Sequence, residues 1–162
     1  MIRTVLSDSL GVLDLEDRME FMHSDAIKVR RIEGKGRGVF ARRPIRKGEV
    51  IERVPVLVLS IEEVRNGSGW TGLAGYCFEW GRGTVALALG YGSLYNHSYR
   101  PNARYDDVNP RTKVFTALRD IAPGEEITVN YNGEPKDRSP LGFKVIETTV
   151  PKNGRGPIDE RC

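Results

Sequence analysis

Cysteine and histidine are scarce in this chain of 162 residues, which holds two of each. The cysteines, Cys77 and Cys162, lie far apart and form no CxxC pair, so the sequence predicts neither a disulfide framework nor a zinc site. No apolar run approaches the ~18 residues of a membrane-spanning helix. The first residues, MIRTVLSDSLGVLDLED, lack the apolar core and cleavage pattern of a signal peptide. We therefore expect an intracellular protein, cytoplasmic or nuclear, with no membrane partner.

The composition suits one domain rather than a dedicated nucleic-acid-binding module. With 39% hydrophobic residues, the 162-residue chain is long enough to bury a single core. The net charge of +3 is only mildly basic, so we expect no direct nucleic-acid partner. The charge is uneven, because residues 8–25 are mostly acidic and residues 28–47 mostly basic. We expect these two segments to pair within the chain.

Short apolar runs bounded by turn residues predict a mainly β fold with few short helices. One helical turn is expected at residues 61–67. Pro55 interrupts a long β-branched run and predicts an edge strand or a bend there. The expected strands are residues 27–32, 50–60, 72–80, 84–90, 103–107, 113–120, 126–130 and 143–150.

These elements predict one domain over residues 27–150. Residues 1–26 show no clean period and form an N-terminal arm of uncertain order, in which residues 15–22 favour a short helix. Residues 151–162 are polar and contain glycine and proline, so we expect a loose C-terminal tail.

One internal repeat is visible. Residues 41–51, ARRPIRKGEVI, align with residues 117–127, ALRDIAPGEEI, with a glycine at the same place in each. Each copy predicts a strand exit, a turn with glycine at positive φ and a strand re-entry. We interpret the repeat as common turn chemistry, which favours a fold of short hairpins over alternating β-α units.

Glycines alternate with basic residues at 34–38, GKGRG. Such a segment bends tightly and lets backbone approach a ligand. A dinucleotide-binding loop would need G-x-G-x-x-G opening a helix, but the spacing is G-x-G-x-G and Pro44 and Gly48 follow. No phosphate-binding GxxxxGK[ST] is present. Taken alone, the segment predicts a glycine-rich hairpin turn.

The stretch from Gly90 to Tyr131 gathers small, turn-forming and hydrogen-bonding residues between apolar strands. It holds His97 within GYGSLYNHSYRPN and ends on PGEEITVNY. Polar loops of this kind, held on a scaffold, are typical of functional sites.

Four segments in order resemble the SET domain: GKGRGVFA at 34–41, YCFEW at 76–80, NHSYRPN at 96–102 and GEEITVNY at 124–131. The match covers residues 28–145. The SET domain is a β-rich family of S-adenosylmethionine-dependent protein lysine methyltransferases. The resemblance implies a β-clip-like fold of short sheets, with a pseudo-knot formed where the C-terminal segment passes under the Asn-His-Ser loop.

The resemblance also implies a cofactor site. The backbone of Lys35, Gly36, Arg37 and Gly38 would wrap the methionine part of S-adenosylmethionine. Asn96 would lie near its amino-acid portion and the main chain of His97 near its adenine. Phe143 is the candidate to lie on the adenine, and plain core packing is an open alternative for it, as a turn-capping imidazole is for His97.

Three tyrosines match positions at the family's lysine channel. Tyr131 matches the catalytic-site tyrosine, and Tyr76 and Tyr105 match tyrosines that line the channel. An isolated strand tyrosine is commonly a half-buried packing residue, which stays open for Tyr76 and Tyr105. No metal is expected, because Tyr99 stands where many members have a zinc-binding cysteine. The chain resembles the minimal branch of the family without flanking zinc modules, which leaves its substrate open; a histone tail is the usual family target, and the oligomeric state is undetermined.

Two rival functions remain at this point. A non-catalytic SET-like or aromatic-cage module would bind lysine-containing peptides through Tyr76, Trp80 and Tyr105. A hydrolase would use Cys77 or Ser98 with His97, although no GxSxG nucleophile elbow is present.

Overall fold

The computed structural model describes residues 24–147. The helix expected at 15–22, the tail at 151–162 and nearly all of the arm therefore lie outside the described residues. No helix in the described part is long and apolar enough to cross a membrane. Ala26 belongs to the folded core, since it is buried and its carbonyl accepts a hydrogen bond from the Arg42 N–H at 2.7 Å.

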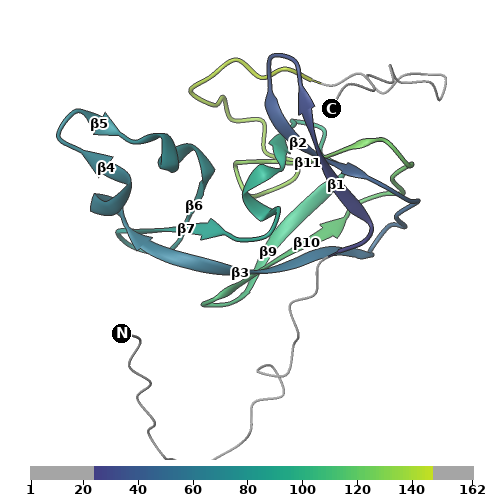
Figure 1. Cartoon of the computed structure of the whole chain (residues 1–162), viewed down its shortest axis with the longest axis horizontal. Helices are drawn as coiled ribbons and strands as arrows, with labels where there is room; N and C mark the ends of the chain where they lie inside the picture. The colour runs from purple at the N-terminus through teal and green to yellow at the C-terminus, as the bar shows by residue number, and fades with distance from the viewer. Residues whose placement is uncertain (1–23, 148–162) are drawn as a thin grey trace, which may run out of the picture.

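The fold is mainly β, as predicted, and residues 24–147 contain three short 3₁₀ helices (Figure 1). The first sheet has the order β1-β2-β11-β8, the second β6-β7-β3-β10-β9, and a third is the small pair β4-β5. The strands are β1 (Ile27–Ile32), β2 (Gly36–Ala41), β3 (Val50–Ser60), β4 (Arg65–Asn66), β5 (Gly69–Trp70), β6 (Cys77–Glu79), β7 (Thr84–Ala88), β8 (Asn96–His97), β9 (Ala103–Asn109), β10 (Thr112–Ala117) and β11 (Glu126–Val129). The 3₁₀ helices are η2 (Ile61–Val64), η3 (Gly72–Tyr76) and η4 (Gly92–Leu94).

Strand β3 runs the length of the molecule and changes partners at Pro55 (Figure 1). Its first half pairs with β10 up to Pro55, and its second half pairs with β7 from Val56 onward. Proline has no N–H to donate, so the junction between two ladders suits it. The expected edge strand is therefore wrong, since β3 is the middle strand of five, and the proline marks a change of partner instead.

The first sheet creates the topology on which the site depends. Strands β1 and β2 form a hairpin around Gly34, and β11 joins β2 in antiparallel pairing. The two-residue strand β8 then pairs in parallel with β11, with Asn96 opposite Thr128 and His97 opposite Val129. Parallel pairing needs a long connection between the strands, so it brings the Asn-His segment beside the strand that leads into Tyr131.

Buried polar side chains hold this arrangement. The Asn102 amide donates to the Glu126 carbonyl at 2.8 Å and accepts from the Thr128 N–H at 2.8 Å, which ties the loop after β8 to β11. Glu52 on β3 accepts from the Tyr91 N–H at 2.9 Å and from the Tyr95 hydroxyl at 3.2 Å. The loop that carries the candidate site is therefore anchored at both ends by buried groups.

Two of the expected strands are wrong in part. Residues 72–76 form η3 rather than a strand, and only Cys77–Glu79 are extended. Residues 143–147 form no strand, and residues 148–150 lie outside the described range. The 3₁₀ turn follows from Gly72 and Gly75, which interrupt the apolar pattern and disfavour a strand.

Candidate active site

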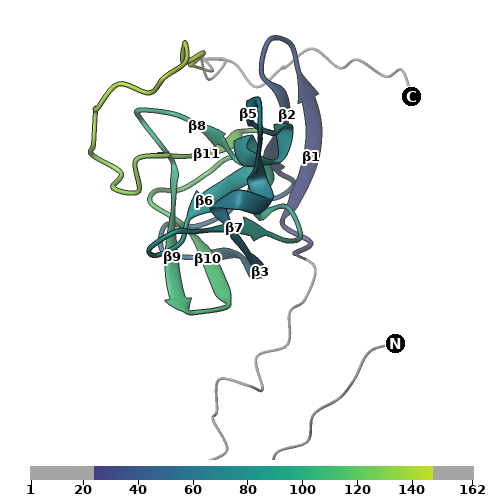
Figure 2. The same cartoon turned by 90° about the vertical axis from the view of Figure 1, so that its left-hand side faces the viewer.

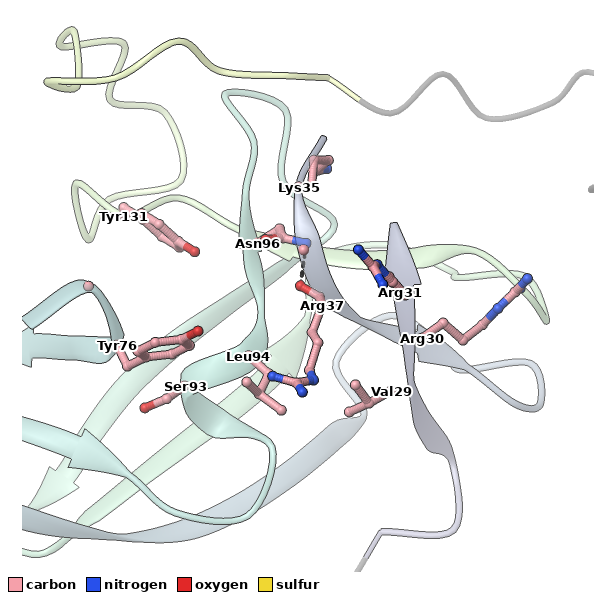
Figure 3. Close-up of a pocket in the computed structure, with 12 residues that line it drawn as sticks. Val29, Arg30, Arg31, Lys35, Arg37, Tyr76, Ser93, Leu94, Asn96 and Tyr131 are labelled. Atoms are coloured by element: carbon pink, nitrogen blue, oxygen red, sulfur yellow. Dashed lines mark hydrogen bonds between the residues drawn. The ribbon is translucent and has the colours of Figure 1, made fainter. Parts of the chain in front are cut away.

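A cavity of about 620 Å³ opens between the β1–β2 hairpin and the loop leading to β8. Figure 3 shows Tyr131 and Tyr76 together on one side of it, with Asn96 and Arg37 next to them and Arg30 and Arg31 beyond. Its volume lies within the range of about 300–1,000 Å³ that small-molecule sites occupy. The lining residues are Val29, Arg30, Arg31, Lys35, Gly36, Arg37, Gly75, Tyr76, Ser93, Leu94, Asn96 and Tyr131.

A second, smaller cavity of about 170 Å³ adjoins the first, with which it shares Lys35, Asn96 and Tyr131. Its other walls are Gly34, His97 and the C-terminal residues 143–146. Figure 2 shows that C-terminal segment, in yellow-green, looping out beside β8 and β11. We call the two adjoining cavities together the cleft; the glycine-rich hairpin, the Asn-His segment and Tyr131 line it.

The glycines of β2 have two different functions. Gly36 has φ +83° and nothing within 4 Å of where a Cβ would stand, so it leaves the backbone open toward the cavity. Gly38 lines neither cavity. A Cβ there would lie 2.7 Å from Asn96 Nδ2 and 2.9 Å from Glu126 Oε1, so Gly38 permits their close approach. The structure therefore gives Gly38 no contact with either cavity, and its close neighbour there is Asn96.

Glu126 organises the floor of the cleft, and sequence reasoning missed it. This buried carboxylate accepts from Asn96 Nδ2 at 2.8 Å and forms an ion pair with Lys35 Nζ at 2.8 Å. The Asn96 amide also donates to the Arg37 carbonyl at 3.0 Å (Figure 3). Because Lys35 and Asn96 meet at this carboxylate and Asn96 also bonds the Arg37 carbonyl, these three predicted cofactor residues are fixed as a unit. The second glutamate of GEEITVNY is the only sequence signal for it.

His97 is a buried side chain with one unused donor. Its Nδ1 accepts a hydrogen bond from the Tyr131 N–H at 3.0 Å, so the proton of the neutral ring sits on Nε2. Burial lowers the pKa of His97, which favours that neutral form. Nε2 is buried and has no hydrogen-bond partner among residues 24–147, and the residue lines the smaller cavity. A buried donor beside a cavity fits a ligand that offers an acceptor.

Tyr131 lines the cleft, and Tyr105 contacts its main chain from behind. The Tyr131 hydroxyl donates to the Tyr95 carbonyl at 2.8 Å, and the Tyr105 hydroxyl donates to the Tyr131 carbonyl at 3.4 Å. Burial is the main cause that raises the pKa of each phenol to about 12. Both are therefore un-ionised at neutral pH. Tyr131 lines both cavities, whereas Tyr105 lines neither and packs behind Tyr131.

Tyr76 and Phe143 lie at opposite parts of the cleft. Tyr76, at the end of η3, lines the larger cavity and is half exposed. Phe143 lines the smaller one, where its ring centroid lies 6.5 Å from that of His97 and 6.3 Å from that of Tyr131. Phe143 remains 54% exposed, so core packing does not account for it.

The C-terminal segment is held against the Asn-His-Ser loop. Glu147 accepts from the Ser98 hydroxyl at 2.6 Å and from the Tyr99 N–H at 3.0 Å. The Tyr99 hydroxyl donates to the Ser139 carbonyl at 3.2 Å. These contacts lie where the expected pseudo-knot would form, and Glu147 is a residue that no sequence pattern singled out.

The sequence profile of the SET domain matches residues 36–132 of this chain. The chain belongs to the SET domain family. It is 39% identical over 106 residues to a Schizosaccharomyces pombe histone-lysine N-methyltransferase specific for histone H3 lysine 37, covering 65% of this chain and 72% of that enzyme. It is 30% identical over 126 residues to the N-lysine methyltransferase KMT5A-A of Danio rerio, covering 69% of this chain but only 37% of that enzyme.

A solved structure of a "putative histone methyltransferase" from Plasmodium falciparum resembles the fold with a TM-score of 0.55 and 32% identity. The likeness covers 65% of this chain and 92% of that one. The profile, the relatives and this fold agree, and the chain is a protein-lysine methyltransferase of the SET family.

In this SET domain the aromatic cage that a peptide-binding module would need is already filled. Lys113 Nζ lies 4.2 Å from the ring centroid of Phe78, 4.3 Å from that of Tyr105 and 5.1 Å from that of Trp80. The Lys113 side chain is 1% exposed. An external lysine has no room there, so the structure removes Trp80 and Tyr105 as a peptide cage.

The hydrolase alternative also fails on geometry. The Ser98 hydroxyl donates to Glu147 and His97 Nδ1 is engaged by the Tyr131 N–H, so the two side chains form no nucleophile–base pair. Cys77 Sγ faces the Leu73 carbonyl at 3.5 Å, and burial raises the pKa of its thiol. A raised pKa disfavours the reactive thiolate.

Proposed function

We propose that this chain transfers a methyl group from S-adenosylmethionine to the side-chain amine of a lysine in a protein, and that a histone is its substrate. The observation that carries the proposal is that Tyr131 and Asn96 line both of two adjoining cavities, and that His97 lines the smaller one with them. The substrate class rests on the names of the two relatives, both lysine methyltransferases and one of them specific for histone H3. A histone substrate would make the protein nuclear.

The residues of the cleft fit the proposed cofactor. The open backbone at Gly36 and the polar groups of Lys35, Arg37 and Asn96 face the larger cavity, where they suit the amino-acid end of S-adenosylmethionine. The smaller cavity offers the unused His97 donor and the exposed face of Phe143, which suit a flat, nitrogen-rich ring. When bound, S-adenosylmethionine supplies an electrophilic methyl group carried on a sulfonium.

The acceptor amine must be deprotonated before it reacts. A lysine with a pKa of ~10.4 is almost wholly protonated at pH 7, and surroundings of low polarity disfavour its ammonium form. Tyr76 and Leu94 give the cavity part of its apolar wall. A neighbouring cationic group acts in the same direction, so a neutral amine is favoured inside the cleft.

Tyr131 is placed to orient that amine. Because its hydroxyl proton is directed to the Tyr95 carbonyl, its oxygen is left as an acceptor toward the cleft. An amine N–H bonded to this oxygen would turn its lone pair away from the tyrosine. Tyr105 supports the same position from behind through the Tyr131 carbonyl. No acid–base pair or covalent nucleophile is needed, since alignment and desolvation are the main requirements of such a transfer.

The decisive experiment is incubation of the chain with radiolabelled S-adenosylmethionine and purified histones, total lysate and lysine peptide arrays, alongside a calorimetric titration of the cofactor. We expect saturable cofactor binding and label on lysine side chains. Absence of cofactor binding at millimolar concentration would refute the proposal. Label on non-histone proteins alone would refute the histone assignment and keep the activity.

A further inference from the structure

Lys113 on β10 is a buried ammonium directly behind the tyrosines of the cleft. Its side chain is 1% exposed, and in the β9–β10 ladder it stands opposite Asp107, whose Oδ1 lies 2.5 Å from Nζ. Asp107 is itself half exposed. Burial lowers the pKa of Lys113, and the hydrogen bond to Asp107 opposes that effect. Burying a lysine charge is costly, and an apolar side chain of similar volume would fill the space without that cost. The position therefore calls for an account beyond packing.

Three aromatic rings enclose this ammonium. Phe78 and Trp80 come from β6 and its end, and Tyr105 comes from β9. The Phe78 and Tyr105 rings also meet edge to face, with centroids 5.0 Å apart. A cation attracts the faces of aromatic rings, most strongly where water is excluded, so Lys113 draws β6 and β9 together through their side chains.

The contacts of Tyr105 connect this cage to the cleft. Its ring touches Lys113 and Phe78, and its hydroxyl donates to the Tyr131 carbonyl. Strand β6 begins directly after Tyr76, which lines the larger cavity. Both tyrosines that flank Tyr131 thus depend on elements that Lys113 joins.

We propose that Lys113 is a positioning residue for the acceptor channel: its caged ammonium fixes Tyr105 behind Tyr131 and so sets the width available to the methylated amine. The proposal deepens the proposed function and rests on it for the identity of the channel. Lys113 does not reach the cleft, since it lines neither cavity.

The test compares Lys113→Met, which keeps the volume and removes the charge, with Lys113→Arg, which keeps the charge. Arg65→Met is the matched control, because it removes a cation–π contact of 5.0 Å with Trp70 in the remote β4–β5 pair. The full chain is labelled at its tyrosine rings for NMR. In parallel, methylation of recombinant histone H3 is followed by mass spectrometry with S-adenosylmethionine as donor.

In Lys113→Met we expect the Tyr105 ring signals to shift and average through faster ring flips. We also expect kcat to fall about tenfold, because Tyr131 loses its support from Tyr105, while the affinity for the donor is unchanged. The share of di- and trimethylated product should rise relative to wild type, because a less firmly held Tyr131 leaves more room for the methylated amine. Lys113→Arg should restore the wild-type product pattern, and Arg65→Met should change nothing.

Wild-type Tyr105 signals and product pattern in Lys113→Met would overturn the proposal. So would a loss of activity that only follows the unfolded fraction measured by circular dichroism. If Lys113→Met does not fold, Asp107→Asn provides the test. This change weakens the ion pair that holds the Lys113 ammonium, at a half-exposed position, and should shift the Tyr105 ring signals in the same direction. A wild-type chain that binds no donor and methylates no protein would defeat the proposed function alone, and the ring signals would still decide whether Lys113 holds Tyr105.

Discussion

Ile45 and Ile121 donate their backbone N–H groups to each other's carbonyl oxygens, at 3.0 and 2.8 Å. On either side of this pair, each hydrogen bond from the second copy to the first has an equivalent bond from the first copy to the second. The Gly124 N–H donates to the Ala41 carbonyl at 2.8 Å, and the Gly48 N–H donates to the Ala117 carbonyl at 2.8 Å. The two copies of the sequence repeat at 41–51 and 117–127 therefore pair with each other as equivalents.

The side chains follow the same rule. Arg43 pairs with Glu49 in the first copy, and Arg119 pairs with Glu125 in the second. Each glutamate also accepts a backbone N–H three residues before it. The sequence suggested only common turn chemistry, and that interpretation was incomplete, because the pairing between copies joins β2 and β3 to β10 and β11.

This equivalence predicts equal costs at the two turn glycines. Gly48 and Gly124 have φ of +82° and +80°, and neither has an atom within 4 Å of where a Cβ would stand, so alanine meets backbone strain and no clash. We expect Gly48→Ala and Gly124→Ala each to lower the free energy of unfolding by about 1–2 kcal/mol. Urea denaturation measures this. Gly67→Ala, which meets neither strain nor contact, is the control and should be near neutral.

Gly38 predicts a different kind of failure. Its Cβ would stand 2.6 Å from Ile32 Cδ1 and within 3 Å of Asn96 and Glu126, so Gly38→Ala must displace the floor of the cleft. We expect the Kd for S-adenosylmethionine to rise about tenfold or more, since an ångström of displacement at a positioned group has that scale. Gly142→Ala, with nothing within 4 Å, should keep wild-type affinity in the same calorimetric titration. Equal affinities in both variants would contradict this account of Gly38.

The strands were largely predictable because their residues alternate or branch at Cβ in long runs. The bounds of β1 and β3 agree with the expected 27–32 and 50–60, and β9 and β10 overlap the expected 103–107 and 113–120. Strand β8 was not predictable, since two residues that pair in parallel with a strand distant in sequence carry no local pattern. The same holds for Glu126 and Glu147, whose partners are tens of residues away in sequence.

Lys113 shows why part of the site escapes sequence reasoning. A lysine in a predicted strand is normally assigned to the solvent face. No residue near Lys113 in sequence indicates that aromatic rings from β6, its end and β9 enclose its ammonium group. The resemblance predicted that Tyr131, Asn96 and His97 belong to one site, and all three line the smaller cavity; their roles stay a prediction. It also suggested Tyr105 as a channel residue, whereas the structure places Tyr105 one layer behind Tyr131.

Tyr131→Phe removes a hydroxyl from a residue that lines both cavities. We expect methyl transfer to fall about tenfold or more, the scale of one positioned polar group in a transition state. Donor affinity should change little. Steady-state kinetics and calorimetry separate the two effects. Tyr99→Phe is the matched control, since it removes a hydroxyl bonded to the Ser139 carbonyl outside both cavities. Wild-type turnover in Tyr131→Phe would remove Tyr131 from the mechanism.

The raised phenol pKa values predict the alkaline limit of stability. Tyr105 and Tyr131 ionise at about 12 in the folded chain, above the ordinary value of 10.0. Above pH 10 the unfolded chain loses these protons first, so the stability they contribute is present below pH 10 and is lost as pH rises toward 12. We expect unfolding midpoints to fall across that window, and less steeply in Tyr105→Phe/Tyr131→Phe. Burial also raises the pKa of Tyr95, so in the double variant this residue still makes the unfolding midpoint fall with pH. An unchanged slope in the double variant would contradict the assignment.

Asn96→Asp tests the carboxylate at the floor of the cleft most directly. The change replaces the amide that donates to Glu126 at 2.8 Å with a second carboxylate, and two such groups in contact cannot both be ionised cheaply. Repulsion between the two carboxylates is relieved when one of them is protonated, so the destabilisation is smaller at low pH and grows as pH rises. We expect the variant to be less stable than wild type by about 1–3 kcal/mol at pH 8 and by clearly less at pH 5.

The control for that measurement is Asn66→Asp. Asn66 lies in the exposed β4–β5 pair, where its Oδ1 accepts the Ser68 N–H at 2.9 Å, a bond that a carboxylate keeps. It should match wild type in urea denaturation at both pH values and in donor affinity at pH 8, while Asn96→Asp should bind the donor about tenfold more weakly there. Lys35 remains beside Glu126 in the variant. Any donor affinity that Asn96→Asp retains therefore measures how well this ion pair alone keeps the floor of the cleft in place. A penalty for Asn96→Asp that is the same at pH 5 and pH 8 would mean that the two carboxyl groups do not meet.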